Sequence, residues 1–578
     1  MQQQFQQSWA ARRRSLLSGT AFAAIMLAGA AGQSDSALAA CTFSDANTFS
    51  CGSMVTTPAD LVPITANGVT TGTVEAGATV SGEGLSVSTA GGSFIIVNNG
   101  TVTGTTAGFN LLALQPQGGD ITYLGNGSAT GGAGLNIRTT SGTIAVGTAG
   151  TPVAPTFSGG YGLMAQSDTG PISVFLNGGS VTSFGAGGLG MVSGGNISAT
   201  LTGSTSITNA GPVGSSIGIG VGAPLGSQGG QSVTSDANIG SAAGRFQYGI
   251  AAYGAGSGNV ALSQTGGAIY AVDGGLAVLD LGGTGTASVD TSAGSSISVN
   301  GTTATSAGIQ ATATGDVTVR AAGAISGGAS GISATSKTGG ASVTATGTIS
   351  DTGNGIAAAG FGRANVAVSG TISASSIGVL AAGDDSTVTA EGKITAGGVG
   401  ILAGGSTAHK AHVSVGSGTV VQGTGLVGVW VNSGSSRIDN DGAIVGGLFG
   451  GVASSAGSTT VNNAGSITST GGIAVNFHFA APTTNNVLIM SGPSATLTGQ
   501  AIGSGTDTFR FAGSGSNSFD VGQIDTGWVL LDKAGSSNWS LTGTSTYTGP
   551  VTVSDGTLSV DGNLNSMSGA TSPAASSS

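Results

Sequence analysis

The sequence is poor in the residues on which most catalysis and most nucleic-acid recognition depend. Of its 578 residues, 6% are charged and 5% are aromatic, and it has only three histidines and two cysteines. Removing the three arginines and one aspartate of residues 1–40 from the 13 basic and 24 acidic residues leaves 10 basic and 23 acidic ones. Because nucleic-acid binding depends on basic groups that neutralise phosphates, this balance argues against a nucleic-acid partner.

Glycine, in contrast, is abundant, with 111 residues. Glycine is one of the poorest helix formers, so its regular recurrence argues against a helical repeat. An excess of small and polar residues is also typical of disordered chains. The hydrophobic fraction of 39%, the mean hydropathy of +0.31 and the regular spacing of the apolar residues favour a folded body instead.

One apolar pattern recurs between Val319 and Ile473 at steps of 22 to 27 residues. Each regular copy has three apolar positions, and glycine directly precedes the last one. Self-similarity at such a fixed period is the mark of a solenoid. The copies are Val319-Ile325-Ile332, Val343-Ile349-Ile356, Val366-Ile372-Val379, Val388-Ile394-Ile401, the looser Val415 and Val429, Ile438-Ile444-Val452 and Val461-Ile467-Ile473.

The kind of solenoid follows from the residues at these positions. They are mostly valine and isoleucine, which fit strands, and three of them per copy predict three short strands and three turns per coil. Each coil can bury its apolar residues only against the coils on either side. The sequence therefore predicts an all-β protein, a parallel β-helix forming one elongated domain. Roughly twenty coils would give a rod on the order of 90–100 Å long.

Four segments follow from the repeat and its flanks. Residues 1–40 read as a signal peptide, with Arg12–Arg14, an apolar stretch and the cleavage site Ala37–Ala39. Residues 41–485 are predicted to form the β-helix with an N-terminal Cys-loop cap, residues 486–562 its C-terminal end, and residues 563–578 a disordered tail. Export by the general route and by the twin-arginine route both remain open, and no transmembrane span is expected after cleavage.

Cys41 and Cys51 stand ten residues apart, directly after the expected cleavage site. In an exported protein such a pair is expected to form a disulfide. It would cap the first coil, whose open strand edge otherwise invites pairing with other chains. The alternative is a lipid on Cys41, because the residues from Leu38 to Cys41 resemble a lipoprotein box.

Two regions depart from the regular repeat. Between Gly134 and Gly308, pairs of glycine and an apolar residue recur at longer steps of 26 to 33 residues. We attribute the extra residues to loops at one corner of the coil, and we expect recognition to reside there. Large aromatic residues gather near the C-terminal end, where we expect them to close the coil stack with a denser core. They are Phe477, Phe479, Phe509, Phe511, Phe519, Trp528 and Trp539.

A stretch near the C-terminus resembles a known family. Residues 539–558 read WSLTGTSTYTGPVTVSDGTL, which resembles the autotransporter-associated β-strand repeat. The resemblance implies the passenger domain of an autotransporter (type V secretion). It further implies a right-handed β-helix that is exported and moved through an outer-membrane translocator barrel to the cell surface. The barrel is absent from this sequence, which leaves three interpretations open: a truncated reading frame, a fragment of a longer autotransporter, or a passenger served by another barrel. Without a supplied barrel the protein would remain periplasmic.

No constellation for chemistry is predicted: catalytic residues, cofactors and metal ligands are all expected to be none. Asp384-Asp385 and Asp439/Asp441 are expected at corners, where aspartate serves turns. His409 and His412 are expected in an exposed loop without a third metal ligand. Residues 503–509 and 513–519 weakly resemble calcium-binding nonapeptides, but ordinary coil strands are the expectation there.

Three functional hypotheses remain. The first is a non-enzymatic, adhesin-like rod, exposed at the cell surface or secreted, which contacts host or neighbouring cells, matrix glycans or proteins, or other copies of itself. The second is an enzyme that acts on polysaccharide along one face of the β-helix. A concave row of acidic and aromatic residues on one face would favour this enzyme, whereas a featureless Ser/Thr surface would favour the rod. The third is a truncated autotransporter remnant without function.

Overall fold

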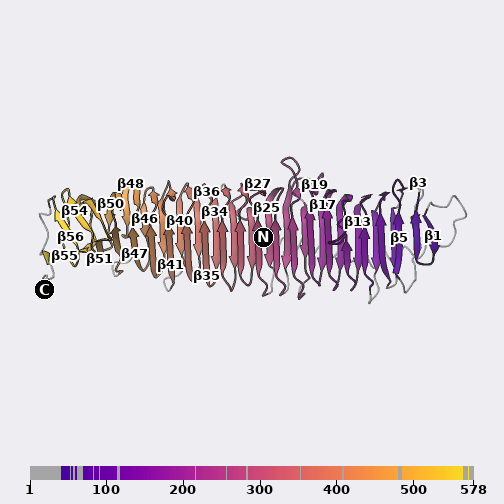
Figure 1. Cartoon of the computed structure of the whole chain (residues 1–578), viewed down its shortest axis with the longest axis horizontal. Helices are drawn as coiled ribbons and strands as arrows, with labels where there is room; N and C mark the ends of the chain where they lie inside the picture. The colour runs from indigo at the N-terminus through magenta and orange to yellow at the C-terminus, as the bar shows by residue number, and fades with distance from the viewer. Residues whose placement is uncertain are drawn as a thin grey trace.

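The computed structural model describes residues 41–52, 54–55, 59–60, 69–82, 84–89, 92–113, 118–214, 216–224, 226–254, 257–280, 284–351, 353–405, 409–479, 484–563 and 570–571. The predicted signal peptide and most of the predicted tail lie outside these residues. The described residues form one long rod of stacked strands, with β1 near one end and β55 near the other (Figure 1). They contain no helix with the length and apolar character that a membrane span requires.

The rod is a parallel β-helix, as the repeat predicts. One strand per coil stacks into a 23-stranded sheet, here sheet A, and most of the other strands stack into a 31-stranded sheet, sheet B. In the regular part, sheet A contains β29 (Val317–Ala321), β32 (Ala341–Ala345), β35 (Arg363–Val368), β38 (Asp385–Ala390), β41 (Lys410–Val415), β44 (Ser435–Asn440) and β47 (Ser458–Asn463).

Sheet B receives two strands from each of these coils except the last. The first set is β30 (Ala324–Ser326), β33 (Thr348–Ser350), β36 (Thr371–Ala374), β39 (Lys393–Ala396), β42 (Val420–Gly423) and β45 (Ala443–Gly446). The second set is β31 (Ser330–Ser336), β34 (Asn354–Gly360), β37 (Ile377–Ala382), β40 (Val399–Gly404), β43 (Val427–Asn432) and β46 (Gly450–Ser454). After them, β48 (Ser466–Asn476) runs through both positions as one strand.

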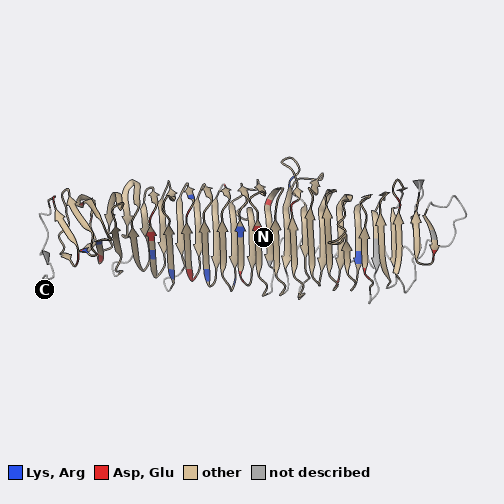
Figure 2. Cartoon of the chain, in the orientation of Figure 1, with Lys and Arg blue, Asp and Glu red and all other residues tan. Residues whose placement is uncertain are grey.

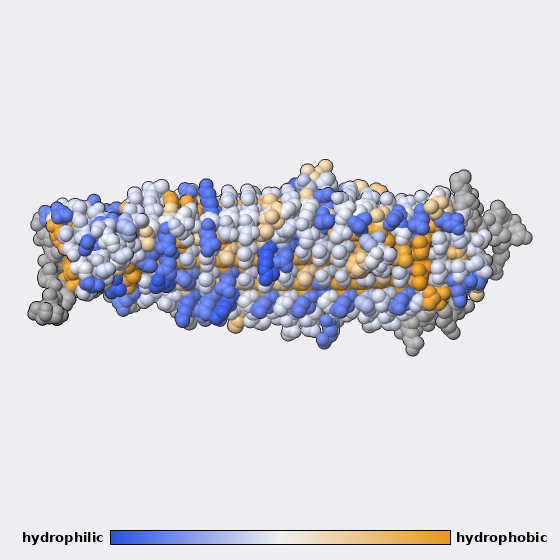
Figure 3. All heavy atoms as spheres, in the orientation of Figure 1, coloured by the Kyte–Doolittle hydropathy of each residue, from blue (hydrophilic) through white to orange (hydrophobic). Residues whose placement is uncertain are grey.

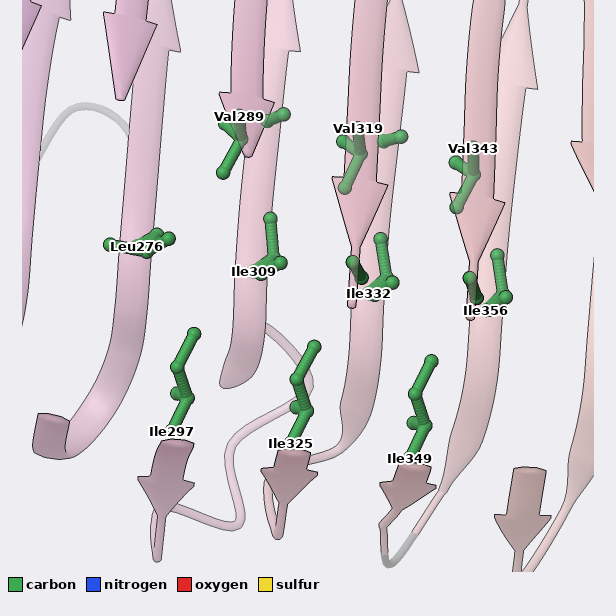
Figure 4. Close-up of a cluster of buried hydrophobic side chains, with 14 of the residues drawn as sticks. Leu276, Val289, Ile297, Ile309, Val319, Ile325, Ile332, Val343, Ile349 and Ile356 are labelled. Carbon is green, nitrogen blue, oxygen red and sulfur yellow. The ribbon is translucent and has the colours of Figure 1, made fainter. Parts of the chain in front are cut away.

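The three apolar positions of the repeat are the core of the rod. Val319 pairs with Val343, Ile325 with Ile349 and Ile332 with Ile356, so each residue stacks on its counterpart in the next coil. Their side chains point into the space enclosed by the strands (Figure 4). The prediction of three strands per coil with these inward residues is confirmed. Because identical positions stack, each coil covers the apolar surface of the next.

In two irregular copies of the repeat, the wrong residue is predicted as the one that stacks on the preceding coil. In each case the correct residue is two positions away on the same strand. Val388 pairs with Val413 rather than with Val415. Val452 pairs with Val475, and Ile473 is only half-buried, because the register of β48 shifts around its glycines. Successive inward residues on a strand are two apart, so spacing alone does not select between them.

The glycine before the third apolar residue has a steric reason. A Cβ added to Gly355 would lie 2.3 Å from Cγ2 of Ile372 and 2.5 Å from the carbonyl oxygen of Gly378, both in the next coil. In the same way, a Cβ added to Gly331 would lie 2.2 Å from Cγ2 of Ile349. Each of these glycines is an inward-facing gap that the isoleucine of the following coil fills. The glycine is therefore required by packing between coils.

Buried asparagines join successive coils at the corner that follows sheet A. Nδ2 of Asn440 donates to Oδ1 of Asn463 at 2.7 Å and to the carbonyl oxygen of Ser466 at 3.1 Å. Nδ2 of Asn463 in turn donates to the carbonyl oxygen of Thr496 at 3.1 Å. These side chains satisfy buried backbone carbonyl groups at the corner, which would otherwise cost free energy.

The longer coils between Gly134 and Gly308 differ from the expectation of loops at one corner. Some of their extra residues lengthen strands: β15 (Thr156–Ser167), β17 (Ser180–Ser193) and β25 (Ala268–Asp280) pass through a corner that other coils break. Others lie in connections at two different corners, between β19 (Ser206–Asn209) and β20 (Ile217–Gly222) and between β20 and β21 (Gln231–Ser235). The prediction of a single corner is wrong.

The predicted aromatic core at the C-terminal end is present in β51 (Asp507–Ala512) and its neighbours. The rings of Phe509 and Trp528 lie 5.3 Å apart and those of Phe511 and Trp539 4.9 Å apart, and all four side chains are buried. Phe479 does not belong to this core. It is 43% exposed and packs outside the β-helix, with its ring 6.1 Å from that of Trp430 and 5.7 Å from that of Phe449.

Asp351, in the connection between β33 and β34, should make stability depend on pH. Burial raises the pKa of its carboxyl group to about 6, although the backbone N–H of Gly353 hydrogen-bonds to it. The unfolded value is about 3.9, so the folded state binds the proton more tightly. We therefore expect the free energy of unfolding to fall as pH rises from about 4 to about 6.

Asp351→Asn should remove this component and increase stability above pH 6. Urea unfolding of both proteins at several pH values measures it, and parallel pH profiles for wild type and variant would contradict it.

Candidate functional site

The N-terminal end is closed by a hairpin. β1 (Cys41–Asp45) pairs with β2 (Thr48–Cys51) in antiparallel fashion, and β2 begins the parallel stack of sheet A by pairing with β5 (Val69–Val74). In the structure a disulfide joins Cys41 and Cys51 across this hairpin. Cys51 is buried, and the ring of Phe49 fills the space above Gly72 of the next strand. The hairpin thus covers the end of the core.

The oxidation of this cysteine pair in the mature protein stays a prediction. Non-reducing mass spectrometry should find one intramolecular disulfide between Cys41 and Cys51. Cys51→Ser should destabilise the first coils by about 2–3 kcal/mol, because a loop of this length constrains the unfolded chain by that amount. Local unfolding measured by hydrogen exchange would report the loss. A diacylated Cys41 would contradict this prediction.

The C-terminal end is built from a third, three-stranded sheet and the last strands of sheet A. The third sheet contains β52 (Ser516–Asp520), β54 (Asn538–Thr542) and β56 (Thr557–Val560), and sheet A continues through β53 (Trp528–Lys533) and β55 (Val551–Val553). Nε1 of Trp539 donates to the carbonyl oxygen of Ala512 at 3.3 Å, and the hydroxyl of Tyr547 donates to that of Pro550 at 2.8 Å. Both aromatic side chains are thereby held in place by backbone groups.

A buried lysine joins the last coils. Lys533 has no exposed side-chain surface, and its Nζ donates to the carbonyl oxygens of Ala534 at 3.1 Å, Gly535 at 2.6 Å and Asp555 at 3.0 Å. Burial lowers the pKa of its ammonium group. The three acceptors match the three N–H donors of an ammonium ion. Gly556 leaves room for it, because a Cβ there would lie 2.6 Å from Nζ.

Charged side chains are thinly spread over the rod (Figure 2), and several of them lie on the outer face of sheet A between β35 and β44. Arg437 and Asp439 both point outward from β44, and Nε and Nη2 of the arginine donate to the two carboxylate oxygens at 2.6 Å each. Nε2 of His412 in β41 lies 2.9 Å from Oδ2 of the same aspartate. Burial alone would raise the pKa of Asp439, but the hydrogen bonds from Arg437, His412 and Asn462 lower it on balance.

These positions correct two sequence expectations. Asp439 lies within a strand rather than at a corner, and His412 is a strand residue rather than part of an exposed loop. Asp384 and His409 do lie at corners, and they contact each other at 3.2 Å. The alternation along β44 of outward Ser435, Arg437 and Asp439 with buried residues is the sequence signal that could have placed the aspartate.

The residues considered for metal binding have other partners. Within the described parts of the chain, no three or more His, Cys, Asp or Glu side chains are close enough together to hold a metal ion. Asp507, from the nonapeptide-like segment, is fully buried. Its carboxylate accepts hydrogen bonds from the backbone N–H and side chain of Asn486 and from the backbone N–H and hydroxyl of Ser504. These donors occupy its oxygens, so the carboxylate serves the fold.

Part of the C-terminal end matches a known family model. Residues 531–560 match the family model of the passenger-associated-transport-repeat. The matched range begins in β53 and ends with β56, contains Lys533 and Trp539, and spans the stretch from Trp539 to Leu558 on which the sequence resemblance rests. No curated protein and no solved structure gives a significant match.

Proposed function

We propose that this protein is a non-enzymatic, adhesin-like rod. The premise is that a β-helix whose last coils match the passenger-associated-transport-repeat indicates an autotransporter passenger. The repeat implies export to the cell surface or the extracellular space and an outer-membrane barrel as partner. The observation that supports a presenting role is the continuity of sheet A from the N-terminal hairpin to the matched repeat, with sheet B beside it as far as β50 (Thr496–Ile502). A stiff rod of this kind extends its outer faces away from the cell.

The outer surface supports contacts spread over many sites. Hydrophilic and near-neutral residues cover most of the face visible in Figure 3, with hydrophobic residues gathered in bands nearer the end that carries β5. Elsewhere, Phe479, Leu448 and Leu426 are exposed apolar residues near Trp430 and Phe449. Many weak contacts along a rod add up when several are made at once.

The test is surface display of the mature chain on a non-adherent bacterium through a supplied translocator barrel. The control is the same barrel with an unrelated passenger. Protease accessibility on intact cells establishes that the rod is outside. We expect the displaying cells to adhere to host cells or matrix, or to aggregate with one another, more than the control cells do. Displayed rods that cause none of these effects would falsify the proposal.

A further inference from the structure

A shallow hollow of about 260 Å³ lies on the outer face of sheet A, over β35, β38 and β41. Its lining brings together unlike groups: two cations, a carboxylate, an amide, a hydroxyl and an imidazole. In a chain with so few charged residues, this mixture is unusual. The side chains that supply these groups are Arg363, Lys410, Asp385, Asn365, Thr387 and His412.

The strand register orders these groups in two rows across the sheet. Arg363 pairs with Asp385, which pairs with Lys410, so the cations lie two strands apart with the carboxylate between them. Two strand spacings correspond to about 9–10 Å. The second row, two residues further along each strand, contains Asn365, Thr387 and His412.

The two cations of the hollow differ from their neighbours on the same face. Arg320 forms an ion pair with Asp290 and Arg510 with Asp532, and the Arg437–Asp439 pair is described above. Among the ion pairs of the described residues, none includes Arg363 or Lys410. Both side chains are exposed. Their charges are therefore available to a ligand.

We propose that this hollow binds an acidic saccharide, with a carboxylate or sulfate group held by Arg363 and Lys410. A guanidinium and an ammonium group are the side chains that bind such anions by charge-assisted hydrogen bonds. Asp385, Asn365 and Thr387 offer acceptors and donors to the hydroxyl groups of the sugar. Asp385 between the cations disfavours a small bare anion, which would offer it no hydroxyl group. The proposal rests on the proposed binding function and names its ligand class.

Direct binding of purified mature chain to polymers tests the site. The probes are polygalacturonate, which carries carboxylates, dextran sulfate, which carries sulfates, and neutral dextran. We expect wild type to bind at least one acidic polymer and not dextran, with affinity that decreases as salt increases. The doubly substituted Arg363→Ala/Lys410→Ala should bind at least tenfold more weakly, and Arg363→Lys/Lys410→Arg should retain binding.

The control variant Arg320→Ala/Lys337→Ala removes the same charge elsewhere and should bind like wild type. Equal binding by the Arg363→Ala/Lys410→Ala variant and wild type, or binding of neither acidic polymer by wild type, overturns the proposal. Equal melting temperatures establish that the variants are folded. The display assay separates the two ideas: if the double variant adheres as wild type does while neither protein binds the polymers, the site is refuted and the rod function stands.

Discussion

Gly355→Ala is expected to destabilise the rod by about 3 kcal/mol or more, although it adds a single methyl group. The added Cβ would lie 2.3 Å from Cγ2 of Ile372 and 2.5 Å from the carbonyl oxygen of Gly378. Overpacking of a well-filled core usually costs about 1–3 kcal/mol, and here one of the atoms in the way belongs to the backbone of the next coil. The strain should separate two coils rather than be absorbed by one side chain.

Gly294→Ala is the matched control. It lies in the turn before β27 (Ser296–Val299), and nothing lies within 4 Å of an added Cβ. Because an alanine there restricts the unfolded chain without a clash, the variant should be as stable as wild type or slightly more stable. Thermal unfolding and limited proteolysis compare the three proteins. If Gly355→Ala had the same melting temperature as wild type, the coils would be able to move apart at this point without a loss of stability, and the prediction would be wrong.

Lys533→Met is expected to loosen the C-terminal coils and spare the rest of the rod. Methionine has a similar length but donates no hydrogen bond, so the carbonyl groups of Ala534, Gly535 and Asp555 would lose their shared partner. An unsatisfied buried acceptor costs about 1–3 kcal/mol, so we expect a loss of about 3 kcal/mol or more. Hydrogen exchange should rise mainly within residues 531–560.

Lys393→Met serves as the control because Lys393 is exposed at the start of β39 and should tolerate the same replacement. The displayed forms add a functional readout. If the matched repeat is where folding outside the cell begins, Lys533→Met should lower the amount of protease-accessible rod, and Lys393→Met should not. Unchanged exchange in residues 531–560 would argue that the lysine is incidental to their stability.

The sequence was sufficient for the fold because the fold is a repetition of local rules. Val319, Ile325 and Ile332 recur with their glycines, and every recurrence strengthens the inference of stacked coils. The same rules fail where the register changes: both Val413 and Val415 point inward from β41, and only pairing with Val388 distinguishes them. Register shifts such as the one in β48 cannot be recognised from the spacing of apolar residues in the sequence.

The candidate site was less predictable, because it depends on which coils bring side chains together. His412 and Asp439 are 27 residues apart in the sequence and in contact in the structure. Nothing in the sequence around Lys533 indicates that its side chain is buried, because its hydrogen-bond acceptors are backbone carbonyl groups of the surrounding turns. Phe479 belongs to the aromatic-rich end by sequence, yet its ring packs outside against Trp430. Each case depends on a contact between coils that composition does not encode.

The N-terminal hairpin also gives the rod a polarity that bears on assembly. A β-helix could in principle grow without limit if one molecule stacked its last coil on the first coil of another. β1, however, runs antiparallel to β2 and occupies the edge of sheet A. A strand that runs in the direction of the stack would therefore have to pair with β1 in antiparallel geometry, and the parallel ladder of sheet A ends at this hairpin. Growth of the same parallel β-helix from this edge is thus interrupted, which gives the long faces of the rod more weight in association.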